Sequence, residues 1–424
     1  MKTMNEKTSK KNLLCIVFVS LAGQIAWQVE NQYYNVFLYN EIAPVPLYVA
    51  LMVAASAIAA TITSIVMGAY SDVKGKRRPF LIIGFICWTI TTAIFPLAAL
   101  VYPIILAVIV AIMFDSVMTF FGSTAYDAAF NAYVTDITTI ENRGKAIGIV
   151  EIMTLIAILI VYGVSGFIIM LYGYYIFFYI VGVLVGIFGI TGALLVKESE
   201  ELSPLSTSVL HHIKNTFKRE NLKNNKDFFL VLTGAAIWGI GFNVFFPFII
   251  IYLQHYIGLS ILGASLLIFI ALLVSIILAI PMGILVDKIG RKRIMILSII
   301  LESISLILFS LVFDIVSLLI FGILWITFMT MFHISGNTWV KDLYPEEKRG
   351  QFSGYFILFT VLFAMVPGPL IGGWLATEFG QPIVIDGVQG MIPTPIIFQV
   401  GAIIMLFAII PLFRAKEIKE DKSK

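Results

Sequence analysis

The chain has 424 residues, of which 60% are hydrophobic and only 12% charged, and its mean hydropathy is +0.99. A soluble domain carries about 25% charged residues, so this composition excludes a protein whose whole surface faces water. The net charge of +3 gives no reason to expect a nucleic-acid partner.

Twelve apolar runs follow one another along the chain, and each is long enough to cross a bilayer as a helix. They occupy residues 12–40, 47–71, 79–101, 103–136, 143–170, 174–196, 228–256, 261–286, 293–312, 316–341, 349–377 and 395–414. We therefore expect an all-α integral membrane protein with twelve transmembrane helices, called segments 1 to 12 below. The long polar interruption at 197–227 predicts a bundle at 1–196, a linker at 197–227 and a bundle at 228–424.

The 28 Lys and Arg residues all lie in the two chain ends, the linker and the loops that follow segments 2, 4, 8 and 10. Positive charge collects on the cytoplasmic side of membrane proteins. We expect a multi-pass protein of the cell membrane with both termini and the linker in the cytoplasm. The first apolar run lacks a small-residue cleavage site and is interpreted as a retained helix.

A motif in the loop after segment 2 returns 215 residues later, after segment 8. The shared pattern is Gly-x3-Asp-x2-Gly followed by three basic residues. It occupies Gly68, Asp72, Gly75, Lys76, Arg77 and Arg78 in the first copy and Gly283, Asp287, Gly290, Arg291, Lys292 and Arg293 in the second. Two copies at matching places indicate a duplicated unit, and hence two pseudo-symmetric bundles of six helices.

A second repeat surrounds segments 4 and 10, with an offset of 206 residues at every matched position. It aligns Asp127, Asn131, Asp136, Glu141, Arg143 and Gly144 with His333, Asn337, Asp342, Glu347, Arg349 and Gly350. The two repeats together make the halves of the chain equivalent.

With its twin motif loops, its two sets of six helices and its central linker on the cytoplasmic side, the chain resembles the Major Facilitator Superfamily. The segment 1 string Gln24-Ile-Ala-Trp27-Gln28-Val-Glu30-Asn31, together with Asp127, is similar to the glycoside–pentoside–hexuronide and sucrose-type sugar symporters. Segment 2 has no acidic residue before Asp72, so the sodium-site carboxylates of the melibiose-permease branch have no counterpart. We expect coupling to H⁺ rather than Na⁺.

The motif loops are interpreted as a cytoplasmic gate. A carboxylate suits the amino end of a helix, and the resemblance implies that Asp72 caps segment 11 near Gly350 and Asp287 caps segment 5 near Gly144. The basic trios could pair with Asp136 and Asp342. The predicted gate comprises Gly68, Asp72, Gly75, Arg77, Arg78, Asp136, Arg143, Gly283, Asp287, Gly290, Arg291, Asp342 and Arg349. The alternative, that the basic residues only anchor the topology, leaves the Asp and Gly spacing unexplained.

Polar side chains gather on segments 1, 4, 7 and 10, whereas segments 6 and 12 are almost purely apolar. Unpaired amides that face lipid are costly, so these stripes must face protein or water. Amides with aromatic neighbours suit a polyhydroxylated ligand. The expected substrate-binding residues are Gln24, Trp27, Gln28, Asn31, Asn131, Trp238, Asn243 and Asn337.

Acidic side chains within membrane segments are rare and point to function. We expect Glu30 and Asp127 to exchange the coupling proton, and His333 to respond to it. Asp115 is open between function and structure. Glu302 and Glu151 are interpreted as structural, because their helices are less polar.

These patterns predict a secondary active transporter that takes up a sugar or glycoside with protons by alternating access. A proton-driven exporter of amphipathic compounds and a non-transporting membrane sensor on the same scaffold are the alternatives. No nucleophile–base pair or metal cluster is expected, so we predict no enzyme activity, no cofactor and no metal. Cys15 and Cys87 are not expected to form a disulfide, and the expected form is a monomer in the lipid bilayer with a small-molecule substrate.

Overall fold

The structure is a computed structural model that describes residues 10–138, 140–198, 202, 204, 208–216, 225–343 and 349–417. Eleven helices among these residues are long and apolar enough to span a membrane. One of them, Gly144–Leu195, has 52 residues, about 78 Å at 1.5 Å per residue, against a hydrocarbon core of about 30 Å. Its backbone breaks at Gly173, where φ is 76°, so it crosses twice. The predicted all-α membrane fold with twelve crossings is confirmed.

The chain divides into two compact units, and one boundary between them lies in the linker, between Lys214 and Asn215. Unit 1 comprises Met1–Ile42 and Ile58–Lys214, and unit 2 comprises Ala43–Ala57 and Asn215–Lys424. The first part of the helix after segment 1 thus groups with unit 2. The expected division at 1–196 and 228–424 does not anticipate this.

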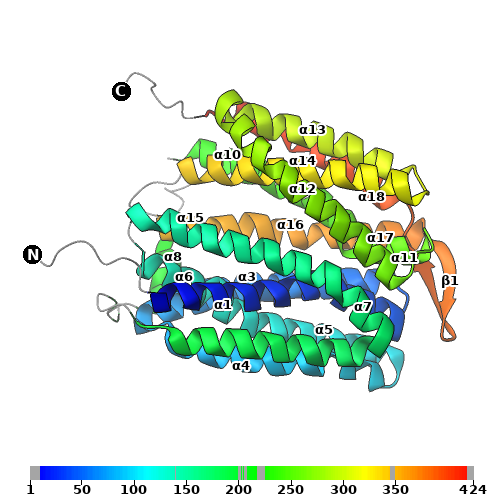
Figure 1. The fold of residues 1–424 in the computed structure, drawn as a ribbon, viewed down its shortest axis with the longest axis horizontal. Helices are drawn as coiled ribbons and strands as arrows, with labels where there is room; N and C mark the ends of the chain where they lie inside the picture. The colour runs from blue at the N-terminus through cyan, green and yellow to red at the C-terminus, as the bar shows by residue number, and fades with distance from the viewer. Residues whose placement is uncertain are drawn as a thin grey trace, which may run out of the picture. The chain divides into compact units, whose positions relative to one another are not determined.

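Unit 1 is built from helices that run along a common direction (Figure 1). Its elements are α1 (Lys10–Val29), η1 (Glu30–Tyr34), α2 (Asn35–Phe37), η2 (Leu38–Ile42), most of α3 (Pro46–Lys74), α4 (Arg78–Ile94), η3 (Phe95–Leu100), α5 (Ile104–Gly122), η4 (Ser123–Phe130), α6 (Asn131–Asp136) and α7 (Ile140–Leu195). The linker helix α8 (Val209–Thr216) follows. Helices are required because lipid satisfies no backbone N–H or C=O group.

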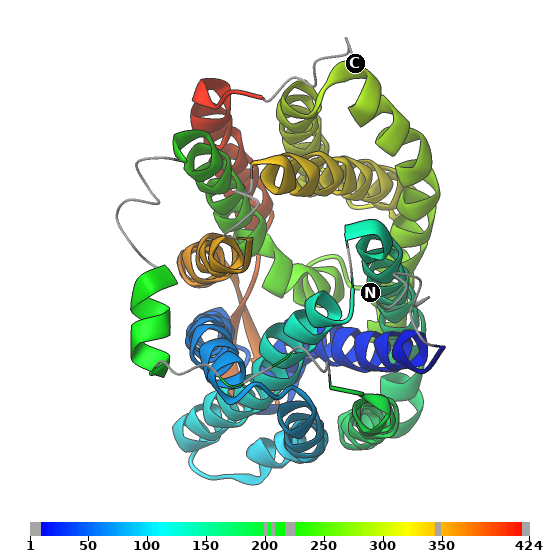
Figure 2. The same cartoon turned by 90° about the vertical axis from the view of Figure 1, so that its left-hand side faces the viewer.

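Unit 2 has the same helical character and one hairpin. Its elements are α10 (Lys226–Phe245), η5 (Phe246–Phe248), α11 (Ile249–His255), α12 (Ile261–Ile289), α13 (Arg291–Ser310), α14 (Ile315–Asp342), α15 (Arg349–Ile357), η7 (Leu358–Leu362), α16 (Phe363–Met365), α17 (Pro367–Glu378), β1 (Gln381–Ile385), β2 (Val388–Ile392), α18 (Ile396–Phe407) and α19 (Ile409–Arg414). In the end-on view, the red α18 and α19 lie beside the green α10 (Figure 2), and these helices are in contact.

Close packing inside unit 1 depends on small residues. A Cβ added at Gly182 would lie 3.0 Å from the Thr89 carbonyl oxygen, and one at Gly186 would lie 2.8 Å from Thr89 Oγ1. Small residues four apart let two helices approach closely within a membrane. Here they bring α7 against α4, the helix that begins in the first motif loop.

The strands β1 and β2 form an antiparallel hairpin with Gln381 opposite Ile392. Asp386 and Gly387 make the turn, with φ of 49° and 82°. Positive φ at both central residues is the geometry that matches the twist of two paired strands. The sequence predicted tight turns here but not the strands, although Asp-Gly between short apolar runs is a hairpin signal.

Candidate functional site

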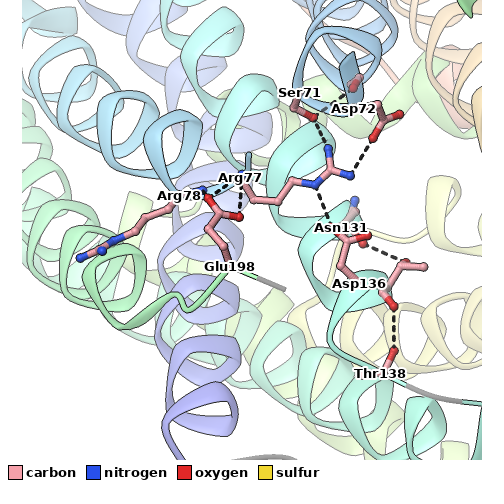
Figure 3. A network of polar contacts seen from close by, with 10 residues as sticks. Ser71, Asp72, Arg77, Arg78, Asn131, Asp136, Thr138 and Glu198 are labelled. Atoms are coloured by element: carbon pink, nitrogen blue, oxygen red, sulfur yellow. Dashed lines mark hydrogen bonds and ion pairs between the residues drawn. The ribbon is translucent and has the colours of Figure 1, made fainter. Parts of the chain in front are cut away.

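The first motif loop is organised around the guanidinium of Arg77, which is 4% exposed. It contacts Asp72 at 2.7 Å and Asp136 at 2.8 Å, and it donates a hydrogen bond of 2.6 Å to Ser71 Oγ (Figure 3). These partners come from the end of α3 and the end of α6. One side chain therefore ties together the ends of two helices that are distant in sequence.

Glu198 caps the helix that starts at this loop. Its carboxylate accepts hydrogen bonds from the backbone N–H groups of Arg77 and Arg78, each at 2.9 Å (Figure 3). Free N–H groups at a helix start favour an anion. Burial acts to lower the pKa of Arg77, but the hydrogen bond to Asp136 and the charges of Asp72 and Asp136 outweigh it, so the pKa is raised. Arg77 is thus held as a cation.

The second motif loop has the same plan among its described side chains. Arg291 Nε lies 2.8 Å from the Asp342 carboxylate, and the two side chains are 24% and 36% exposed. The Arg291 backbone N–H donates to Glu417 Oε1 at 2.6 Å. Lys292 Nζ donates to the carbonyl oxygens of Phe413 and Ala415, at 2.8 Å and 2.7 Å. The chain that follows segment 12 is thereby attached to the second loop.

The two expected pairings of motif arginine with aspartate are present, whereas the role of these residues as a gate stays a prediction. Gly75 and Gly290 have φ of 61° and 105°, a backbone that favours glycine. A Cβ at Gly68 or Gly283 would meet nothing within 4 Å, so no close packing requires glycine there. The side chains of Asp287, Arg143 and Arg349 lie outside the described residues, and the expected caps on segments 5 and 11 stay predictions.

Sequence reasoning missed Ser71, Glu198 and Glu417. A signal for the two glutamates was available: a Lys-Glu pair follows segment 6 as Lys197-Glu198 and segment 12 as Lys416-Glu417. The two pairs are 219 residues apart, close to the 215-residue offset of the motif loops. The duplicated unit therefore includes the cap as well as the loop.

Glu30 and Asp127, the expected coupling carboxylates, both lie in π-helical segments of unit 1. Glu30 begins η1 and Asp127 lies within η4. Thr119 Oγ1 lies 3.4 Å from Glu30 Oε1, and Ser123 Oγ donates to Asp127 Oδ2 at 2.8 Å. Both carboxylates are only half-buried. Single turns of π-helix occur often at functional sites, and the hydroxyls that meet the two acids, on Thr119 and Ser123, are four residues apart along α5 and η4.

The expected substrate amides of unit 1 have different surroundings. Gln24 Nε2 donates to the Tyr126 hydroxyl at 3.0 Å, so it joins two helices. Asn31 and Asn131 donate to carbonyl oxygens four residues earlier in their own helices, which leaves their amide oxygens to accept. Trp27 is half-buried, with its ring centre 4.8 Å from that of Trp88. Gln28 is half-buried as well. The structure supports a structural role for Gln24.

In unit 2, Trp238 is 5% exposed and stacks on Phe332 and Phe242, with ring centres 4.2 Å and 5.2 Å away. Its indole N–H donates to Glu302 Oε2 at 2.9 Å. Aromatic neighbours cover the Trp238 ring, and its role in substrate binding stays a prediction. Asn243 is also buried, 7% exposed, and donates to the Gly239 carbonyl oxygen.

His333 and Asn337 are exposed on α14. The apolar residues Ile320 and Leu324 are exposed nearer its start. At 100° per residue, His333 lies about 180° around the helix from Leu324. His333 and Asn337 therefore lie on the face of α14 opposite Ile320 and Leu324. This is the arrangement expected if the polar face is directed to water. Among the described residues, no group of three His, Cys, Asp or Glu side chains is placed to hold a metal ion.

Comparison with known proteins identifies one family. A model described as "Major Facilitator Superfamily" matches residues 16–270 and 231–424. Multidrug resistance protein 2 of Bacillus subtilis (strain 168) is 26% identical over 259 residues. That match covers 60% of this chain and 61% of the relative.

Solved structures share the fold over nearly the whole chain. The nucleoside transporter NupG has a TM-score of 0.70 at 15% identity, covering 96% of this chain and 100% of that one. A D-xylose-proton symporter has a TM-score of 0.64 at 17% identity, covering 98% of each chain. A bacterial homologue of the human lysosomal transporter Spinster has a TM-score of 0.69 at 14% identity, covering 97% and 96%.

Proposed function

Because this chain belongs to the Major Facilitator Superfamily, and is therefore a multi-pass membrane transporter and not an enzyme, we propose that it takes up a sugar or glycoside together with protons. The proposal places both termini and the linker in the cytoplasm of a cell-membrane protein that works as a monomer. The coupling ion and the substrate class rest on the residues described next.

One observation carries the proposal: two half-buried carboxylates lie in π-helical segments, and each meets a hydroxyl on the segment 4 helix. A carboxylate that loses water favours its neutral form. Glu30 and Asp127 would bind protons from one side, become neutral, and permit the loaded protein to reorient.

The substrate class follows from hydrogen-bonding capacity. Asn31 and Asn131 donate to their own helices and keep acceptor oxygens, and the Gln28 amide is half-buried. Such groups, together with Trp27, suit several hydroxyl groups and a sugar-ring face. The motif residues Asp72, Arg77 and Asp136 would act as a gate that holds this end of unit 1 together until reorientation.

The test uses Asp127→Asn in proteoliposomes, with Asp314→Asn, a cap outside the membrane helices, as control. Uphill uptake driven by a pH gradient should vanish in Asp127→Asn, because the neutral form is permanent. Counterflow of labelled sugar, which needs no net proton release, should survive. Uphill uptake at the wild-type rate would exclude Asp127 from coupling, and absent counterflow in the wild type would favour the sensor.

Proton-driven export of amphipathic compounds is the second candidate. The 26% identity to a protein named for multidrug resistance favours it, although that match spans 61% of the relative's length. Inverted vesicles that accumulate a fluorescent amphipathic cation on acidification, without sugar counterflow, would establish export over uptake.

A further inference from the structure

Glu302 is a fully enclosed acid of unit 2. It lies in the middle of α13 and is 0% exposed. Its Oε2 accepts the hydrogen bond from Trp238, and its Oε1 has no hydrogen-bond partner among the described residues. The nearby hydroxyls of Ser298 and Ser305 are used elsewhere, since they donate to the carbonyl oxygens of Met295 and Leu301.

Within the described part of unit 2, no charged side chain accompanies this carboxyl group. The charged residues on the helices that pack against α13, and on α13 itself, lie at the helix ends: Lys226 and Asp227 on α10, Asp287 and Lys288 on α12, Lys341 and Asp342 on α14, Arg414 on α19, and Arg291, Lys292 and Arg293. Arg293 is nine residues from Glu302, about 14 Å along the axis. α18 carries no titratable group.

His333 is the titratable residue of α14 that does not lie at a helix end. Its ring meets the Trp238 ring edge-on, with centres 4.9 Å apart and planes at 83°. Trp238 thus lies between a buried carboxyl group and an exposed imidazole. A bare carboxylate in an apolar site costs several kcal/mol, whereas a neutral acid keeps one hydrogen bond to the indole and places no charge there.

We propose that Glu302 is a second proton-carrying site, in unit 2, and that Trp238 reports its protonation state to the exposed face of α14 at His333. Loss of the proton leaves a charge between α10 and α13, and this charge strengthens the Trp238 hydrogen bond, since bonds to ionised acceptors are the stronger ones. The proton passes to water when a different conformation opens the site. The sequence assigned Glu302 a structural role, and this site is additional to Glu30 and Asp127.

Tryptophan fluorescence of the purified full-length protein tests this without any transport assay. The wild type should show a pH-dependent step in emission, and both Glu302→Gln and Trp238→Phe should remove it. Trp325→Phe is the matched control, because Trp325 is 3% exposed and its indole N–H lacks an acid partner. It should keep the step, as should Asp127→Asn and Glu30→Gln.

Infrared difference spectra give the second measurement. A protonated-carboxyl band that shifts in D₂O and is missing in Glu302→Gln is expected. The proposal is overturned if the wild type has no fluorescence step, if the step persists in Glu302→Gln, or if the band is unchanged in that variant. A step that Na⁺ produces at constant pH would make the site a cation site instead. Failure of sugar uptake would leave these results unaffected.

Discussion

The two motif loops share a sequence pattern but differ in how deeply they are embedded. In unit 1, Arg77 is 4% exposed and its guanidinium reaches two carboxylates and a hydroxyl. In unit 2, Arg291 is 24% exposed, and among the described side chains its guanidinium meets the Asp342 carboxylate at 2.8 Å. The environment sets the energy of such a contact: an exposed ion pair contributes about 0–1 kcal/mol, whereas breaking a buried one costs about 3–5 kcal/mol. A duplicated motif therefore does not imply duplicated energetics.

The arginines provide the largest test of this difference. Arg77→Met should lower the free energy of unfolding by about 3–5 kcal/mol, because it leaves Asp72 and Asp136 without their cation. Arg291→Met should cost about 0–1 kcal/mol. Denaturant unfolding in detergent, followed by tryptophan emission, measures both. Equal losses would show that the two loops are energetically equivalent.

The motif glycines should show the opposite order, with the larger loss of stability in the second loop. Gly75 has φ of 61°, a left-handed conformation that costs a non-glycine residue about 1–2 kcal/mol. Gly290 has φ of 105° and ψ of 147°, a region that costs about 1–3 kcal/mol, and an added Cβ would lie 3.3 Å from Glu417 Oε2. Gly290→Ala should therefore lose more stability than Gly75→Ala, measured as before. A larger loss at Gly75 would contradict the backbone argument.

The glutamate caps test what the two units have in common. Glu198 accepts from the N–H groups of Arg77 and Arg78, and Glu417 from that of Arg291. Replacing a capping side chain by alanine costs about 0.5–2 kcal/mol. Glu198→Ala and Glu417→Ala should fall in this range, with the larger loss at Glu198. No loss at Glu417 would mean that the chain after segment 12 is not held at the loop.

The smallest effect is expected where segments 4 and 10 begin. α14 starts with Asp314, which accepts from the Ser317 backbone N–H at 2.9 Å, whereas α5 starts after Pro103 without a side-chain cap. This hydrogen bond lowers the pKa of Asp314. Its contribution is present above the unfolded-state pKa and lost as pH falls through the lower folded-state value. Melting temperatures should therefore drop slightly less on acidification in Asp314→Asn, which keeps the acceptor and cannot titrate. An identical acid response would argue against the cap.

The membrane fold and one acidic partner for each basic trio could be predicted from the sequence alone. A membrane crossing depends on hydropathy over about 20 residues, which is a local property of the sequence. The twelve apolar runs therefore predicted all the crossings, including the two that are separated only by the break at Gly173. The basic trios were expected to pair with Asp136 and Asp342 at the ends of segments 4 and 10, and Arg77 and Arg291 are the residues that do so.

The partner of each polar side chain, in contrast, depends on how the helices pack. Helical periodicity places Gln24 and Trp238 on a face but does not say which residue faces them; Tyr126 and Glu302 lie 102 and 64 positions away. The π-helical turns at Glu30 and Asp127 shift side chains around the axis in ways that a regular period cannot show. Burial of Arg77 against exposure of Arg291 likewise depends on packing between distant helices. Such contacts are fixed by how whole helices fit together, and no stretch of sequence contains that information locally.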